Sequence, residues 1–208
     1  MNKKYWQKFY RKNSSRSDIS NFSSFAKFCY KNFLNEKTKT IVELGCGNAR
    51  DAKFFAQDYF VYALDQIIEQ KILNSNKNSK LNLVEQDFVH TEFNFNEKVD
   101  VFYSRFTIHS ITEDEQYKLL PKVYNHLNNN GLFCIEARTT KDSKFGVGKH
   151  ISDTTYFNDN HNRRFINSQD FLNQTLSLGF KLRYFNEQDN LSVCKKDNPV
   201  LMRVILEK

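Results

Sequence analysis

The sequence lacks several features that would define its class at once. No run of apolar residues approaches the ~20 needed to cross a membrane, and the first residues lack the apolar stretch of a signal peptide. We therefore expect a cytoplasmic location and no membrane partner. The four cysteines include no Cys-x-x-Cys pair and have no histidine at ligand spacing, so neither a zinc site nor a disulfide framework is indicated. We predict reduced thiols and no bound metal.

The basic residues are spread along the chain and do not form a cluster in the sequence. Lys and Arg number 31 against 24 Asp and Glu, a net charge of +7, yet the basic residues form no block of five or six. Such a charge would suit nucleic acid or a phosphorylated ligand, but alone it identifies no partner. The sequence contains no internal repeat and no linker. Its 208 residues, 39% of them hydrophobic, predict one α/β domain over residues 1–208.

Helical and extended patterns alternate along the chain. Aromatic residues three and four apart predict amphipathic helices over 5–12 and 22–34, which would form a helical cap in residues 1–38. Strands are predicted at 40–44, 60–64, 81–85, 99–103, 132–136, 180–185 and 200–206. Helices are predicted at 49–58, 66–74 and 168–179, and from a capping box at 112–115 to a turn at 128–131, with a kink or break at Pro121. This order predicts a mostly parallel sheet whose last strand is antiparallel.

A glycine turn follows the first of these strands. Gly45 and Gly47 let the backbone approach a ligand, and Asp65 at the end of the second strand could accept both hydroxyls of a ribose. Arg50 occupies the position where a dinucleotide site needs a glycine, and the spacing excludes a Walker loop. Glu43 suits an ammonium group better than a pyrophosphate. The pattern therefore predicts a nucleoside ligand that carries a positive charge.

The segment Glu43-Leu-Gly-Cys-Gly-Asn-Ala, with Asp65 and with Gln86-Asp87-Phe88, resembles the class I S-adenosylmethionine-dependent methyltransferases over about residues 39–208. The resemblance implies a Rossmann-like α/β fold with a seven-stranded sheet and helices on both faces. It implies S-adenosylmethionine as cofactor and S-adenosylhomocysteine as product. Ala49 departs from the family's third glycine, a small change that should be tolerated if φ there is negative. The predicted cofactor-binding residues are Glu43, Gly45, Cys46, Gly47, Asn48, Arg50, Asp51, Asp65, Gln66, Asp87, Phe88, Ser104, Trp6 and Tyr10.

Some of these roles have simpler alternatives. Asp65 could be a plain helix cap, although its place at a strand end favours the ribose role. Asp87 could cap a turn instead of reading adenine. Asp51, in the first turn of a helix, could merely complement the helix dipole.

The acceptor site is expected where the fourth strand ends, in Tyr103-Ser-Arg-Phe-Thr-Ile-His109. Methyl transfer is an in-line displacement, so an enzyme mainly aligns the acceptor and keeps a lone pair free. We predict His109 as the general base for an oxygen acceptor, with Arg105 and Tyr103 as further candidate catalytic residues. The alternative is that His109 hydrogen-bonds backbone and has no catalytic role.

Basic residues recur around the predicted acceptor site. Arginines can hold a phosphoryl or carboxyl group through paired hydrogen bonds, although any single loop arginine more often lies in solvent. The predicted substrate-binding residues are Arg105, His109, Arg138, Arg163, Arg164 and Tyr5. The long polar loop at 138–164 is predicted to act as a lid together with the N-terminal aromatic helix.

Three segments give a narrower resemblance. The glycine-turn string, the Tyr-Ser-Arg-Phe segment and Arg-Arg-Phe-Ile at 163–166 are similar to small bacterial methyltransferases of surface-polysaccharide pathways, including O-methyl phosphoramidate decoration of capsules. We therefore predict methylation of an oxygen, less readily a nitrogen, of a small anionic metabolite by a monomer or homodimer. The alternatives are an RNA methyltransferase, disfavoured because no RNA-binding module is evident, and a non-catalytic partner subunit that binds S-adenosylmethionine.

Overall fold

The computed structural model describes residues 21–95, 97–195 and 197–208. A seven-stranded sheet with the order β3-β2-β1-β4-β5-β10-β9 forms its centre. The strands are β1 (Thr40–Leu44), β2 (Phe60–Asp65), β3 (Leu81–Glu85), β4 (Val99–Arg105), β5 (Leu127–Arg138), β9 (Lys181–Gln188) and β10 (Leu201–Glu207). The pairs among β1 to β5 are parallel, whereas β10 runs antiparallel to both of its neighbours. The predicted seven-stranded Rossmann-like sheet is confirmed.

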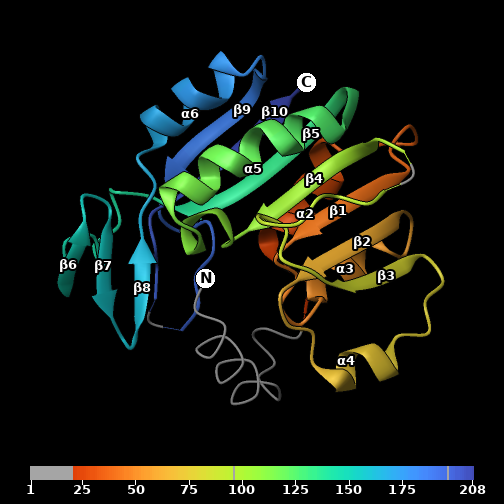
Figure 1. Ribbon diagram of the computed structural model, residues 1–208, viewed down its shortest axis with the longest axis horizontal. Coiled ribbons are helices and arrows are strands. Elements are labelled where there is room, and N and C mark those ends of the chain that lie inside the picture. The colour runs from red at the N-terminus through yellow and green to blue at the C-terminus, as the bar shows by residue number, and fades with distance from the viewer. Residues whose placement is uncertain (1–20, 96, 196) are drawn as a thin grey trace.

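Helices cover both faces of this sheet, as predicted (Figure 1). Helices α2 (Ser24–Asn32) and α3 (Arg50–Phe55) pack on one face, where Phe25 and Phe55 are buried in one hydrophobic core. Helices α5 (Glu113–His126) and α6 (Ser168–Ser177) pack on the other, where Leu119 and Phe171 belong to a second core. The short α4 (Gln70–Ser75) follows β2 and buries no residue fully. Within the described ranges, no helix is long and apolar enough to cross a membrane.

Helix α5 starts and ends differently from its neighbours. Its capping box is formed as predicted, because Thr112 and Glu115 exchange side-chain and backbone hydrogen bonds. The helix then continues unbroken through Pro121 to His126. Strand β5 begins at the next residue and includes 128–131, which we had predicted as a turn before the strand. The helix therefore passes directly into the strand that carries Arg138.

Residues 149–164 form a separate three-stranded antiparallel sheet where we predicted a polar loop. Its strands are β6 (Lys149–Ser152), β7 (Thr155–Asn158) and β8 (His161–Arg164), and it lies to one side of the main sheet (Figure 1). The β7–β8 hairpin turns through Asp159 and Asn160, which both have positive φ, 52° and 64°. Two consecutive left-handed residues are typical of a tight hairpin turn. This inserted sheet forms one wall of the candidate site.

The glycine turn after β1 is held tightly. The amides of Gly45 and Cys46 both donate to the carbonyl of Leu64 on β2, at 2.8 and 3.0 Å. Gly45 has φ +77°, and a Cβ there would lie 2.6 Å from Oγ1 of Thr107, so a side chain is excluded by backbone conformation and by space. Ala49 also adopts the left-handed region, with φ 57°. The condition of a negative φ, under which alanine would replace glycine without strain, is therefore not met at Ala49.

Candidate functional site

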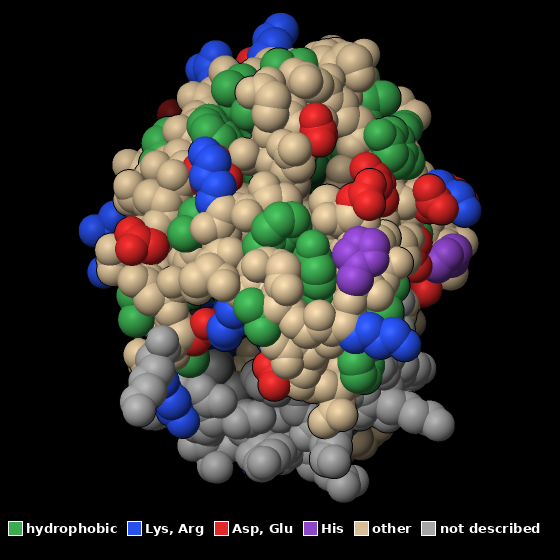
Figure 2. All heavy atoms as spheres, turned by 90° about the vertical axis from the view of Figure 1, so that its left-hand side faces the viewer, with side chains coloured by type: hydrophobic (Ala, Val, Ile, Leu, Met, Phe, Trp, Pro, Cys, Tyr) green, Lys and Arg blue, Asp and Glu red, His purple; other side chains and the backbone are tan. Residues whose placement is uncertain are grey.

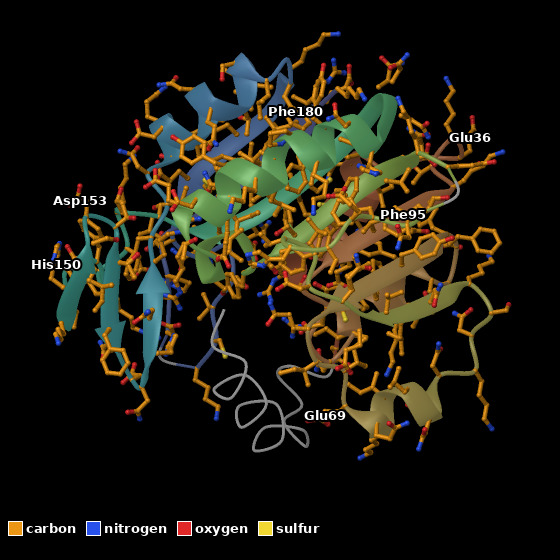
Figure 3. All side chains as sticks on the ribbon, in the orientation of Figure 1. Glu36, Glu69, Phe95, His150, Asp153 and Phe180 are labelled. Carbon is orange, nitrogen blue, oxygen red and sulfur yellow. The ribbon has the colours of Figure 1, made fainter. Side chains whose placement is uncertain are left out.

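A cavity of about 1910 Å³ lies at the carboxyl ends of β1, β2 and β4 and extends to the inserted sheet. It is the place where open α/β sheets bind ligands. His150 and Asp153 mark the outer rim of the inserted sheet (Figure 3). The predicted residues that line the cavity are Glu43, Gly45, Cys46, Gly47, Asn48, Arg50, Asp51, Asp65, Arg105, His109, Arg138, Arg163 and Arg164.

Glu43 places a buried carboxyl group beside the glycine turn. The residue is 4% exposed, and its Oε2 has no hydrogen-bond partner among the described residues. Burial raises the pKa of Glu43 well above its ordinary value, and the nearby charge of Asp51 raises it further. A buried acceptor without a partner is costly, so this wall of the cavity is suited to a ligand that donates hydrogen bonds or carries positive charge.

Asp65 lines the same side of the cavity. One carboxylate oxygen accepts from the amide of Gly47 at 2.8 Å, and the other accepts from the amide of Ile67 at 3.2 Å. Burial raises the pKa of Asp65, while these amide hydrogen bonds act in the opposite direction. The carboxylate is therefore fixed against the glycine turn, and its oxygens have lone pairs left for hydroxyl donors.

The predicted adenine-reading residues are bonded to each other and to backbone. Gln66 donates from Nε2 to Asp87 at 2.8 Å, and Asp87 also accepts from the amides of Val89 and His90. Neither Gln66 nor Asp87 lines the cavity. The side chain of Phe88 is buried in the hydrophobic core. In this arrangement Asp87 orders the turn after β3, and the adenine role remains a prediction.

Asp51 joins three elements behind the cavity wall. It accepts from the amide and the hydroxyl of Ser23 at 2.6 and 2.7 Å, and from the hydroxyl of Tyr103 at 2.8 Å. Tyr103 is fully buried and does not line the cavity; burial first, then Asp51, raises its pKa well above the ordinary value. Ser104 is buried as well, and its hydroxyl has no partner among the residues described. Tyr103 therefore supports Asp51 and does not reach the cavity as the predicted catalytic role requires.

His109 lines the cavity, yet one of its ring nitrogens is already engaged. The backbone amide of Arg138 donates to Nδ1 at 3.1 Å, so a neutral ring carries its proton on Nε2. Burial lowers the pKa of His109 well below its ordinary value, and Arg138, Arg164, Arg163 and Arg105 lower it further. The ring is neutral at neutral pH and offers a donor. This arrangement matches the backbone-bonded alternative and does not favour a general base.

Arg105 belongs to a buried ion network instead of standing free at the acceptor site. Its Nε donates to Glu136 Oε1 at 2.9 Å, and its Nη2 donates to the hydroxyl of Ser192 at 2.7 Å. The other oxygen of Glu136 accepts from Arg203 on β10 at 2.7 Å. Arg203 also donates to the carbonyl of Leu191. The network therefore holds the loop at 191–192 against the sheet.

Arg138 is also paired with carboxylates. Its Nη1 donates to Asp142 at 2.9 Å, and its Nη2 donates to Asp197, which also accepts from Lys144 at 2.6 Å. These contacts join the end of β5 to the loop before β10. Arg138 shapes the cavity wall, and its charge is balanced within the protein.

The positive charges of Arg163 and Arg164, at the end of β8, are less well balanced by carboxylates than those of the preceding arginines. Arg163 lies 3.7 Å from the exposed carboxylate of Asp159, and its Nη1 is buried without a partner in the described chain. Arg164 donates from Nη2 to the carbonyl of Ile108 and to Oε1 of Gln116, both at 2.7 Å. Its Nε is also buried without a partner in that part of the chain. Burial lowers the pKa of Arg164 to about 10, so it remains charged at neutral pH.

Some of the cavity wall was not anticipated. The loop at 191–194 lines it, as do Ser23 and Ile151, and no local motif or periodicity marks these residues. The predicted cofactor residues Trp6 and Tyr10, and the predicted substrate residue Tyr5, lie outside the described residues.

No group of three metal-ligating side chains was found in residues 21–95, 97–195 and 197–208. Basic, acidic and hydrophobic side chains are interspersed on the face toward the inserted sheet (Figure 2).

Residues 41–131 match a family described as a methyltransferase domain. No match was found among curated proteins. An S-adenosylmethionine-dependent methyltransferase from Clostridium acetobutylicum is similar in fold, with a TM-score of 0.67, 16% identity and 98% of each chain covered.

Two further solved structures extend the fold comparison. A Burkholderia thailandensis 1,6-didemethyltoxoflavin-N1-methyltransferase with bound S-adenosylhomocysteine has a TM-score of 0.71 at 11% identity, covering 98% of this chain and 87% of that one. A glycopeptide N-methyltransferase complexed with S-adenosylmethionine has a TM-score of 0.64 at 15% identity, covering 90% and 87%. The chain thus has the fold of S-adenosylmethionine-dependent methyltransferases, and S-adenosylmethionine is the cofactor that the partial family match and this fold imply.

The residues of the cavity fit this cofactor. S-adenosylmethionine carries an ammonium group, and Glu43 supplies a buried acceptor oxygen that has no partner within the described residues. It also carries a ribose, and Asp65 presents a carboxylate at the adjacent strand end. Both residues adjoin the glycine turn, because Glu43 precedes it in the chain and Asp65 accepts from the amide of Gly47. The donor and acceptor pattern on this side of the cavity is therefore complementary to the cofactor.

Proposed function

We propose that the methyltransferase transfers the methyl group of S-adenosylmethionine to an oxygen, less readily a nitrogen, of a small anionic metabolite. The observation that carries this proposal is the polarity of one cavity. Glu43, a buried acceptor, lies on the glycine-turn side, and Arg163 and Arg164, which have buried donor atoms, lie on the inserted sheet. A cationic cofactor and an anionic acceptor would each meet complementary groups.

The bound cofactor would supply an activated methyl group on a sulfonium centre. The chain's part is to bind and align, because in-line displacement gains most from positioning the two reactants. Glu43 would hold the ammonium group and Asp65 the ribose hydroxyls. The buried walls around them would exclude water from the reacting atoms.

His109 would act in this scheme as a hydrogen-bond donor that orients the acceptor. Its Nδ1 is engaged by the amide of Arg138, so a proton taken from the acceptor would have to displace that bond or the existing Nε2 proton. This favours an acceptor atom that has a free lone pair at neutral pH, such as an ionised oxygen or an amine. Nitrogen is therefore the second candidate, and two of the similar folds are N-methyltransferases.

Two other functions are less well supported. RNA methylation would use the net charge of +7, but Arg105, Arg138 and Lys144 are paired with carboxylates, which leaves less free charge for phosphates. A non-catalytic subunit would use the cofactor site alone. A place in surface-polysaccharide synthesis stays a prediction from the narrower sequence resemblance.

The test is a screen for S-adenosylhomocysteine release with phosphorylated and carboxylated metabolites, each compared with its neutral analogue. We expect turnover only with anionic acceptors, and His109→Gln should retain most of it, because the amide group keeps an acceptor for the Arg138 amide and a donor for the methyl acceptor. A loss of turnover to background in that variant, with cofactor binding intact, would restore the base role. Turnover that requires RNA would replace the metabolite proposal, and cofactor binding without any turnover would favour the non-catalytic subunit.

A further inference from the structure

Two residues that line the cavity each have a buried guanidinium nitrogen without a partner in the described chain. These atoms are Nη1 of Arg163 and Nε of Arg164, neighbours at the end of β8. Arg164 is 7% exposed, so its Nε cannot rely on bulk water. Buried donors are almost always hydrogen-bonded, since an unmet donor costs the free energy of its lost hydration. Two such atoms beside one cavity indicate a ligand that accepts hydrogen bonds.

The other arginines that line the cavity in the described chain, Arg50, Arg105 and Arg138, each have a carboxylate partner. Arg105 is bonded to Glu136, and Arg138 is bonded to Asp142 and Asp197. Arg164 has no carboxylate partner in the described residues and bonds only to neutral oxygens. Glu113 and Glu115 influence its pKa, but neither forms an ion pair with it. Positive charge is therefore least compensated at Arg164, and at its neighbour Arg163 it is balanced, within the described ranges, only by the exposed carboxylate of Asp159.

His109 lies within reach of the same charges. Arg164 and Arg163 are among the groups that hold its pKa low, so all three residues share one electrostatic environment. The neutral ring carries its proton on Nε2 because Nδ1 accepts from backbone. The ring therefore adds a third donor to the region without adding a third charge.

We propose that Arg163 and Arg164, with Nε2–H of His109, form the subsite for an oxyanion group of the methyl acceptor, phosphoryl or carboxylate. The proposal rests on the proposed function, because it names the part of the acceptor that the enzyme recognises. Guanidinium groups bind both oxyanions through directed, charge-assisted hydrogen bonds. Arg105 and Arg138, which we also predicted to bind substrate, would instead fix the wall against which the acceptor lies.

The position of β8 explains how cofactor and acceptor would be kept apart. The main sheet provides the glycine turn, whereas β8 belongs to the inserted sheet (Figure 1). Thr155 on β7 is the register partner of Arg164 and also lines the cavity. The inserted sheet would thus determine acceptor specificity, while the glycine turn holds the cofactor.

The test titrates inorganic phosphate and, separately, acetate into the full chain by calorimetry. The variants are Arg163→Gln and Arg164→Gln, and the matched control is Arg183→Gln, an arginine on β9 that is paired with Glu207 outside the cavity. We expect each cavity variant to bind the preferred anion about tenfold or more weakly, since charged hydrogen bonds are lost. The control should bind like the unaltered chain. Thermal unfolding and S-adenosylmethionine binding, measured on every variant, verify that the fold is retained.

Each outcome has a defined meaning. Tighter phosphate binding assigns a phosphoryl group, and tighter acetate binding assigns a carboxylate. Anion binding that is undetectable, or that is equally strong in both cavity variants and the control, overturns the subsite. Failure of the proposed function is distinguishable, because it would appear as absent S-adenosylmethionine binding in the unaltered chain. Asp65→Asn should weaken cofactor binding while leaving anion binding intact.

Discussion

Ala49 is a single residue in a conformation that its side chain disfavours. Its φ of 57° and ψ of 26° place it in the left-handed region immediately before α3. The residue is fully buried, so its backbone has little freedom to relax. An L-residue other than glycine pays about 1–2 kcal/mol there because Cβ crowds the following carbonyl. The sequence could not reveal this, since alanine by itself suggests an ordinary helical φ.

Ala49→Gly should therefore stabilise the protein. We expect a gain of about 1 kcal/mol in the free energy of unfolding, or about 2–4 °C in melting temperature for a chain of this size. Thermal unfolding followed by circular dichroism measures it. Ala52→Gly is the matched control, because Ala52 is inside α3 and glycine there should cost about 1 kcal/mol. A lower melting temperature for Ala49→Gly would contradict the strain that we assign.

His109 should make stability depend on pH in a defined direction. Its pKa in the folded chain is lowered from 6.5, first by burial and then by the arginines around it. The unfolded chain takes up the proton at higher pH than the folded chain. The stability contribution is therefore complete above about pH 6.5 and decreases as pH falls toward the folded pKa, by up to about 1.4 kcal/mol per pH unit.

Urea unfolding near pH 7.5 and near pH 5.5 tests this dependence. We expect the unaltered chain to lose more stability on acidification than His109→Gln, which retains an acceptor for the Arg138 amide. Some pH dependence should remain in the variant, because burial also lowers the pKa of His161. Equal losses in the two proteins would show that His109 does not resist protonation in the folded state.

At the scale of elements, the strands of the main sheet were predictable and the inserted sheet was not. Strands such as β1 and β4 are apolar runs bounded by turns, which is a strong local signal. Strand β8 reads His-Asn-Arg-Arg, and such a polar sequence has no alternation to detect. The Asp159-Asn160 turn was the available signal, since asparagine and aspartate tolerate positive φ.

The ion pairs between elements could not be predicted from the sequence either. Glu136 and Arg203 are 67 residues apart in sequence, yet their side chains lie 2.7 Å apart. Nothing local pairs Arg105 with Glu136 or Arg138 with Asp197. The sequence therefore identified arginines at the correct edge of the sheet, but it could not separate those with structural partners from those without.

Lys122 on α5 holds the turn that carries Asp87. Its ammonium group donates to the carbonyls of Val89 and Thr91, at 2.8 and 2.7 Å, and approaches that of Phe88 at 3.4 Å. Lys122→Met should leave these carbonyls unpaired and lower stability by about 1–3 kcal/mol. It should also weaken S-adenosylmethionine binding if the turn contacts the cofactor.

Denaturant unfolding and calorimetry measure the two effects of Lys122→Met. Lys118→Met, an exposed position one turn earlier on α5, is the control and should change neither quantity. Lost stability with unchanged cofactor affinity would mean that the turn after β3 does not support the cofactor site. Unchanged stability would mean that the ammonium contacts contribute nothing net.

At the scale of the whole molecule, two structural units meet at one cavity. The parallel sheet positions Glu43 and Asp65 where strands end, which follows from its topology. The inserted sheet and the loop at 191–194 close the opposite side. The side with the glycine turn could be predicted because its motif is local. The side with the inserted sheet could not, because it is assembled from segments that meet only in the folded chain.

The central claim is that this cavity binds S-adenosylmethionine through the carboxylates at the strand ends. Isothermal titration of S-adenosylmethionine into the unaltered chain, Asp65→Asn and Glu85→Gln tests it most directly. Glu85 is the control because it is the register partner of Asp65 on β3 but does not line the cavity. We predict saturable binding to the unaltered chain and to Glu85→Gln, with affinity about tenfold or more weaker in Asp65→Asn. Absence of binding to the unaltered chain, or equal affinity in all three proteins, would contradict the account.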